Sequence, residues 1–75
     1  MKRAERALNE AYVHLTQARA EVAMAEVWLG EVWARHHQKR LSDAADNELR
    51  WIELDLSAIK EHLDSAITRS IEVRL

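Results

Sequence analysis

Histidine has the widest chemical range of the residue types in this chain, because its imidazole can bind a metal or transfer protons near neutral pH. The sequence contains His14, His36, His37 and His62. His36 and His37 are adjacent, so on a helix they point about 100° apart and do not form the i, i+4 pair that chelates metals. We expect no metal site and interpret the histidines mainly as basic residues of helix ends.

The other arrangements that support catalysis are missing from the sequence. The chain has no cysteine and a single glycine, so it has neither a thiolate nucleophile nor a glycine-rich phosphate loop. No nucleophile stands beside a base in a pattern that predicts a cleft. We therefore expect no catalytic residue and no cofactor, and we predict that the protein is not an enzyme.

Large apolar side chains carry more information than the polar ones. The stretch from Ala20 to Ala34 is the most apolar part of the chain, and Glu21, Glu26, Glu31 and Gly30 are its only interruptions. A helix with this pattern is apolar on nearly every face, so it needs to be covered on more than one side. This property favours a protein that binds another protein.

An alternating spacing of four and three residues runs through both halves of the chain and predicts two long helices. Alanine alternates with leucine or valine in the first half, and leucine and isoleucine dominate the second. This is the heptad repeat of coiled coils. The predicted core, which is also the predicted dimer seam, consists of Leu8, Leu15, Val22, Leu29, Leu49, Ile52, Leu56, Ile59 and Leu63.

The fold class that follows is all-α, an antiparallel two-helix hairpin forming one domain. We predict helices over about 2–40 and 44–74, joined by a turn at about 41–43. Ser42 or Asp43 suits the N-cap of the second helix. A turn this short makes the helices antiparallel. Gly30 falls inside the first helix, where glycine costs about 1 kcal/mol relative to alanine; it marks either a close helix approach or a tolerated outer position.

One hairpin of 75 residues buries too little apolar surface to be stable alone. Disulfides are excluded because the chain has no cysteine. Two hairpins that pack as a four-helix bundle would bury the seam from both sides. We therefore predict a homodimer.

Several apolar residues lie off the predicted seam, where they are free to contact another molecule. Two interpretations stay open: these residues belong to a broad dimer interface, or they bind a different protein. Tryptophan and methionine are frequent anchors at recognition surfaces. The candidate partner-binding residues are Met24, Val27, Trp28, Trp33, Trp51 and Leu54.

The charge balance argues against a general attraction to nucleic acid or membranes. The formal net charge is -2, and no apolar run approaches the length of a bilayer span. The first ten residues lack the apolar segment of a secretion signal, so we expect a cytoplasmic protein that does not insert into membranes. Lys2, Arg3 and Arg6 form a local basic group that could contact an acidic partner or RNA.

The first helix resembles that of the Rop-type plasmid copy-number regulators in Lys2, Ala7, Leu8, Asn9, Ala11 and Gln17. Those regulators are dimeric helical hairpins that bind paired RNA loops. The resemblance implies an RNA-binding face at Lys2, Asn9, Val13 and Gln17. Val13 stands where that family has a phenylalanine that stacks on bases. RNA is therefore the second candidate partner.

The middle of the chain is similar to small phage-encoded helical hairpins that disable host proteins, such as quorum-sensing regulators and pilus motors. The similarity lies in Ala25-Glu26-Val27-Trp28 and in Leu49-Arg50-Trp51-Ile52-Glu53. It implies a dimeric inhibitor, encoded by a phage, that binds a host protein through exposed hydrophobic side chains. The function we expect is regulation or inhibition of another protein; an RNA-binding regulator and a purely structural bundle or chaperone are the alternatives.

Overall fold

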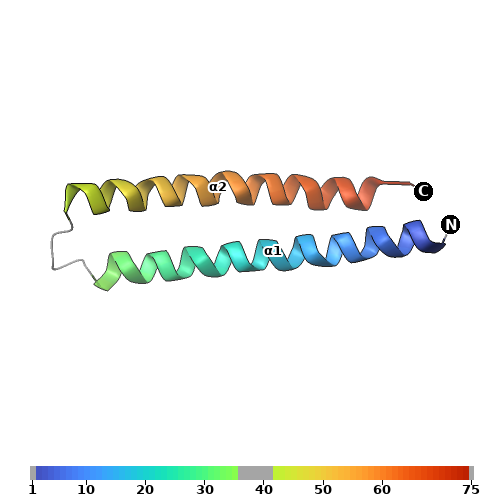
Figure 1. The fold of residues 1–75 in the computed structure, drawn as a ribbon, viewed down its shortest axis with the longest axis horizontal. Helices are drawn as coiled ribbons and strands as arrows, with labels where there is room; N and C mark the ends of the chain where they lie inside the picture. Colours follow the sequence, from blue (N-terminus) through green and yellow to red (C-terminus); the bar gives the residue numbers. More distant parts are fainter. Residues whose placement is uncertain (1, 36–41, 75) are drawn as a thin grey trace.

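The computed structural model describes residues 2–35 and 42–74, which form two antiparallel helices (Figure 1). Helix α1 spans Lys2–Arg35 and helix α2 spans Asp43–Glu72. The all-α hairpin predicted from the heptad spacing is confirmed. The predicted end of the first helix, at residue 40, lies outside the described residues. The two termini lie at the same end of the hairpin (Figure 1).

Helix α2 begins at a side-chain cap and ends two residues before the predicted position. The Ser42 hydroxyl accepts a hydrogen bond from the Ala45 backbone N–H at 3.1 Å. Ser42 is thus the N-cap, and it satisfies one of the backbone donors that the first turn leaves unpaired. At the other end, Val73 adopts an extended backbone with φ -65° and ψ 128°, which stops the helix after Glu72.

The seam residues lie between the helices without being fully enclosed. Most of them are half-buried, Leu29 and Leu56 among them, whereas Ile52 and Ile59 are 43% and 45% exposed. None of the described residues is buried. Two helices alone can cover only one side of each apolar stripe, so the described hairpin has a seam but no enclosed core.

Polar contacts join the helices along one side of the seam. The Lys60 ammonium lies 3.0 Å from both carboxylate oxygens of Glu26, and Arg19 Nε lies 2.8 Å from Asp64 Oδ1. These contacts agree with a register in which Leu29 faces Leu56. Because the four charged groups are partly exposed, each pair contributes modestly, at about 0.2–1 kcal/mol.

Gly30 lies on an open part of α1. A Cβ atom added there would meet nothing within 4 Å. Within the described hairpin the glycine therefore does not mark a close approach of α1 and α2, and the interpretation as a tolerated position fits better.

Candidate protein-binding surfaces

Three large apolar side chains form a patch on the outer face of α1. Met24, Val27 and Trp28 are 50%, 59% and 64% exposed. Their i, i+3 and i+4 spacing places them beside one another on the helix surface. Trp28 borders the seam, and Met24 and Val27 lie farther round the helix. We call these three residues the α1 patch.

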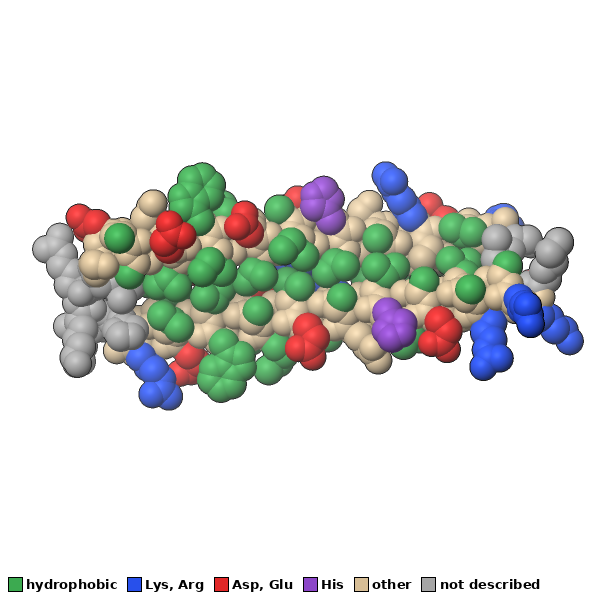
Figure 2. All heavy atoms as spheres, in the orientation of Figure 1, with side chains coloured by type: hydrophobic (Ala, Val, Ile, Leu, Met, Phe, Trp, Pro, Cys, Tyr) green, Lys and Arg blue, Asp and Glu red, His purple; other side chains and the backbone are tan. Residues whose placement is uncertain are grey.

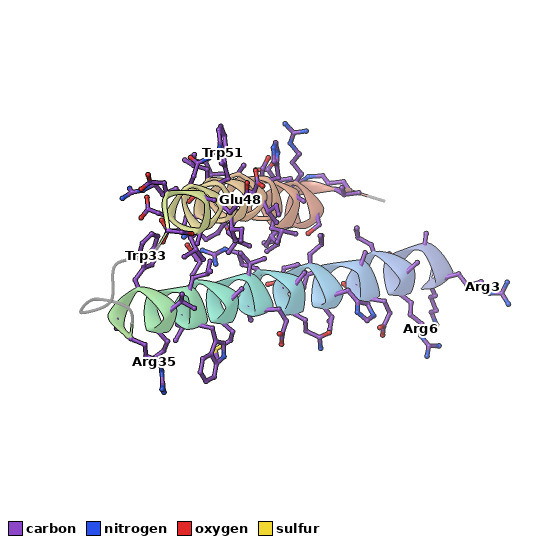
Figure 3. The ribbon with its side chains drawn as sticks, turned by 60° about the vertical axis from the view of Figure 1, so that its left-hand side comes forward. Arg3, Arg6, Trp33, Arg35, Glu48 and Trp51 are labelled. Carbon is purple, nitrogen blue, oxygen red and sulfur yellow. The ribbon has the colours of Figure 1, made fainter. Side chains whose placement is uncertain are left out.

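A smaller patch lies on the outer face of α2. Trp51 and Leu54 are 56% and 59% exposed and stand three residues apart. Trp51 points away from α1 (Figure 3). We call these two residues the α2 patch. The structure therefore distributes five of the six predicted partner-binding residues over the outer faces of two helices.

Trp33 lies apart from both patches, because it points from α1 toward α2 (Figure 3). Its indole N–H donates to Glu53 Oε1 at 2.5 Å, and the Arg50 guanidinium carbon lies 5.6 Å from the ring centroid. Arg50 in turn donates to Asp46 at 2.8 Å, and this hydrogen bond raises the pKa of Arg50. Its two polar neighbours on α2, Glu53 and Arg50, make Trp33 a contact between the helices.

A second apolar surface runs along the side of the seam opposite the polar contacts. The polar side carries the residues four positions after Val22, Leu29, Leu49 and Leu56, which are Glu26, Trp33, Glu53 and Lys60. The apolar residues of the other side stand three positions after members of the same row of leucines and valine. On a helix these two positions flank the seam on opposite sides. Figure 2 shows hydrophobic side chains continuing along the junction of the helices on one face. We call this side the open face, and it consists of Ala18, Ala25, Val32, Ile52, Ile59 and Ala66.

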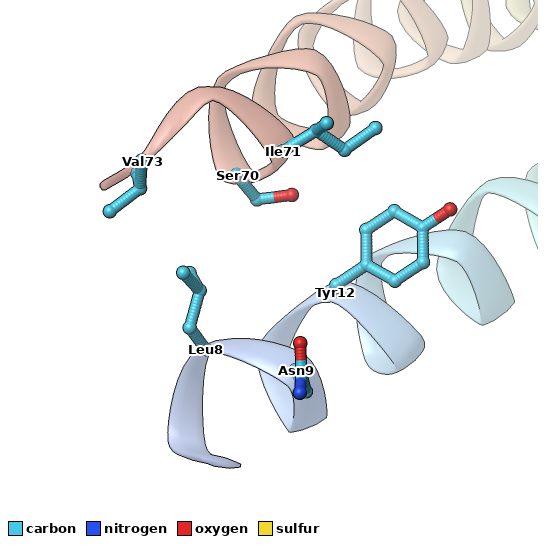
Figure 4. A pocket seen from close by; sticks show the side chains of 6 residues that line it. All are labelled: Leu8, Asn9, Tyr12, Ser70, Ile71 and Val73. Atoms are coloured by element: carbon cyan, nitrogen blue, oxygen red, sulfur yellow. The ribbon is translucent and has the colours of Figure 1, made fainter. Parts of the chain in front are cut away.

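A shallow depression of about 340 Å³ lies between the helices at the end that holds the termini (Figure 4). Its lining is mainly apolar, with one amide and two hydroxyl groups. The Ser70 hydroxyl already donates to the Ile67 carbonyl at 2.7 Å. Its polar groups are the Asn9 amide and the hydroxyls of Tyr12 and Ser70. The lining residues are Leu8, Asn9, Tyr12, Ser70, Ile71 and Val73.

The described residues do not bring metal ligands together. No group of three histidine, cysteine, aspartate or glutamate side chains within residues 2–35 and 42–74 is placed to hold a metal ion. His14 and His62 are both exposed. His36 and His37 lie outside the described residues.

Basic side chains gather near the end that holds the termini. Arg3 and Arg6 extend from the first turns of α1 and point away from α2 (Figure 3). Lys2, Asn9 and Gln17, which the resemblance to RNA-binding hairpins singled out, are exposed as well. This end of α1 is therefore accessible to a large partner.

Neither a membrane-spanning segment in the described helices nor a known relative of the chain is found. Neither α1 nor α2 contains a segment long and apolar enough to cross a membrane. The chain matches no protein-family model, no curated protein and no solved structure.

Proposed function

We propose that this protein is a non-enzymatic regulator or inhibitor that binds another protein through the α1 patch. The observation that supports the proposal is the exposure of Trp28, Met24 and Val27, which are 64%, 50% and 59% accessible and adjacent on one helix. In the described part of the chain, Trp28 has no hydrogen bond or ring contact that would explain its position. An unpaired tryptophan beside a methionine is typical of a recognition surface.

The patch has the composition of a binding hot spot. A tryptophan buries about 150–250 Å² when it is covered, and tryptophan is among the residues that dominate measured binding energies. Met24 adds a flexible side chain that adapts to an irregular partner surface. The α2 patch, with Trp51 and Leu54, would provide a second contact on the other helix.

The same proposal includes the setting in which the protein acts. We propose that the protein is a homodimer, because the described hairpin has no buried residue of its own. We also propose that it acts in the cytoplasm. The similarity of the α1 and α2 tryptophan segments to phage-encoded inhibitors supports a bacterial host protein as the target. Inhibition would then follow from occupation of the target's own binding surface.

Affinity capture from a bacterial lysate tests the proposal when it uses matched variants. The wild-type chain should retain a specific protein, and Trp28→Ala should weaken binding of that purified protein at least tenfold, because truncating a hot-spot tryptophan costs about 2 kcal/mol or more. Circular dichroism should show unchanged helicity. Glu10→Ala, an exposed change on the same helix, is the control and should bind like wild type.

Two results would count against this function. If Trp28→Ala binds the captured protein as tightly as wild type, the α1 patch is not the binding site. If Trp28→Ala loses its helicity, Trp28 supports the fold and is not a free contact. Capture of no specific protein by the wild-type chain would favour the structural alternative, a bundle without a partner of its own.

RNA binding is the second candidate, supported by the exposed basic residues on the first turns of α1. Lys2 and Arg6 would contact phosphates, and Asn9 and Gln17 would lie on the same exposed side. Binding of structured RNA through such contacts weakens steeply as salt increases. Gel retardation of stem-loop RNA at 50 and 200 mM salt tests this candidate, and absent or salt-independent retention would end it.

A further inference from the structure

The hairpin exposes much more surface than a compact protein of its mass. A folded monomer of 8.7 kDa has about 4,700 Å² of accessible surface, whereas this chain has 6463 Å². The excess is roughly 1,700 Å², close to the area that each subunit of an obligate homodimer covers. A second copy of the chain would therefore account for the missing burial.

The open face is the part of the surface that such a copy would cover. Ile52 and Ile59 are seam residues by their spacing, yet 43% and 45% of their surface is accessible. On α1 the same face carries Ala18 and Ala25, whose small side chains let a neighbouring helix approach closely. The polar contacts of Glu26 and Trp33 lie on the other side. The open face is thus apolar and continuous along the junction of the helices (Figure 2).

Charged residues along the edge of the open face indicate how the second copy is oriented. Glu48, Asp55, His62 and Arg69 follow one another at seven-residue intervals, and the first three stand directly before the seam residues Leu49, Leu56 and Leu63. The row begins with two carboxylates and ends with an imidazole and a guanidinium. In the described part of the chain none of the four makes a hydrogen bond or ion pair. Such a row is complementary to itself when two copies run in opposite directions.

We propose that two copies pack through their open faces in antiparallel orientation, with α2 against α2, α1 against α1, and the turns at opposite ends. Glu48 then lies beside Arg69 of the partner subunit, and Asp55 lies beside His62 of the partner subunit. The two-fold axis passes near Ile59, which packs against the partner subunit's Ile59. This inference rests on the homodimer of the proposed function and specifies its interface.

The opposite choice, with both turns at one end, brings different residues together at the edges of the interface. It sets α2 of one copy against α1 of the other, and the register of the hairpin then brings Arg69 beside His14. Asp55 would meet Trp28, whereas Glu48 would meet Arg35 and His62 would meet Glu21. The antiparallel arrangement sets Glu48 beside Arg69 of the partner subunit and Ile59 against its own copy, whereas the opposite choice sets Ile59 against α1. On α1 the antiparallel arrangement brings Trp28 to the edge of the contact, beside Glu21 of the partner subunit, and leaves Met24 and Val27 outside it.

Single-cysteine variants test the position of the axis, because the wild-type chain has no cysteine. Under mild oxidation Ile59→Cys should form a covalent dimer in most molecules, since two copies of this residue meet at the axis. Ser65→Cys lies on the outer face of the same helix and is the control. Crosslinking of Ile59→Cys no greater than that of Ser65→Cys would overturn the arrangement.

A charge exchange at exposed positions keeps the test valid if Ile59→Cys unfolds. Glu48→Arg alone and Arg69→Glu alone should each raise the dimer dissociation constant about tenfold, because each affects two symmetric pairs. The double variant E48R/R69E should return to within about twofold of wild type. A double variant no better than the single ones would contradict the pairing. Both experiments use this protein alone, so their failure is separate from a failure to capture a target.

Discussion

The three tryptophans occupy two kinds of environment, although nothing in their chemistry distinguishes them. Trp33 stands four residues after Leu29 and reaches Glu53 and Arg50 across the seam. Trp28 and Trp51 stand at positions that point away from the opposite helix, and both are more than half exposed. Position in the heptad, and not residue type, therefore decides which tryptophan joins the helices and which remains available.

Replacing Trp33 by phenylalanine should lower the free energy of unfolding by about 1 kcal/mol. The ring would remain, but the hydrogen bond from the indole N–H to Glu53 would be lost. Urea unfolding followed by circular dichroism measures the change. Trp51→Phe removes an exposed indole N–H and is the matched control, with an expected change below about 0.5 kcal/mol. Equal effects of the two variants would show that the Trp33 contact contributes nothing specific.

The sequence could predict the seam but not the two sides of it. The spacing identifies Leu29 and Leu56 as facing residues, and their half-buried state is consistent with this. Residues three positions and four positions after Leu29 or Leu56 flank the seam on opposite sides. Which of the two sides points into the hairpin depends on the direction in which the chain turns between the helices. For this reason the contact of Trp33 with Glu53 and the exposure of Ile52 were not predictable.

At the scale of the elements, each helix follows directly from local sequence. The heptad spacing and the absence of proline favour long helices, and Ser42 starts α2 by accepting the Ala45 N–H. The predicted end of α2 at residue 74 differs from the observed Glu72 because Val73 is extended. Helix ends depend on one or two backbone angles, so spacing alone locates them less well than it locates the helix itself.

Gly30→Ala should raise the free energy of unfolding by about 0.5–1 kcal/mol. A Cβ at this position meets open space, and alanine restricts the unfolded chain more than glycine does. The change would be measured as a higher urea midpoint with an unchanged dependence on urea concentration. Destabilisation would mean that another chain approaches α1 closely at residue 30, which would contradict an interface formed by the open face.

At the scale of the molecule, the hairpin is an extended rod with dimensions of 58 × 16 × 13 Å between its Cα atoms. A rod made of two helices leaves half of each apolar stripe accessible, and no described residue reaches full burial. The two helices form the predicted hairpin, but they do not enclose a hydrophobic core. The seam and the open face together have the pattern of one side of a four-helix bundle.

Thermal unfolding should therefore depend on protein concentration. If folding is coupled to dimer formation, the midpoint should rise by about 5 °C for each tenfold increase in concentration, given an unfolding enthalpy of roughly 100 kcal/mol for the pair. Circular dichroism at 1, 10 and 100 μM measures the shift. A midpoint independent of concentration over this range would indicate a hairpin that is stable by itself.

Sedimentation equilibrium of the wild-type chain and Trp28→Ala, at matched micromolar concentrations, tests the central claim most directly. The claim is that a second copy completes the fold while the α1 patch stays available to a partner. Both proteins should sediment at twice the chain mass of 8.7 kDa, with full helicity. A folded wild-type monomer would contradict the dimer, and a wild-type dimer with a monomeric or unfolded Trp28→Ala would place the α1 patch inside it.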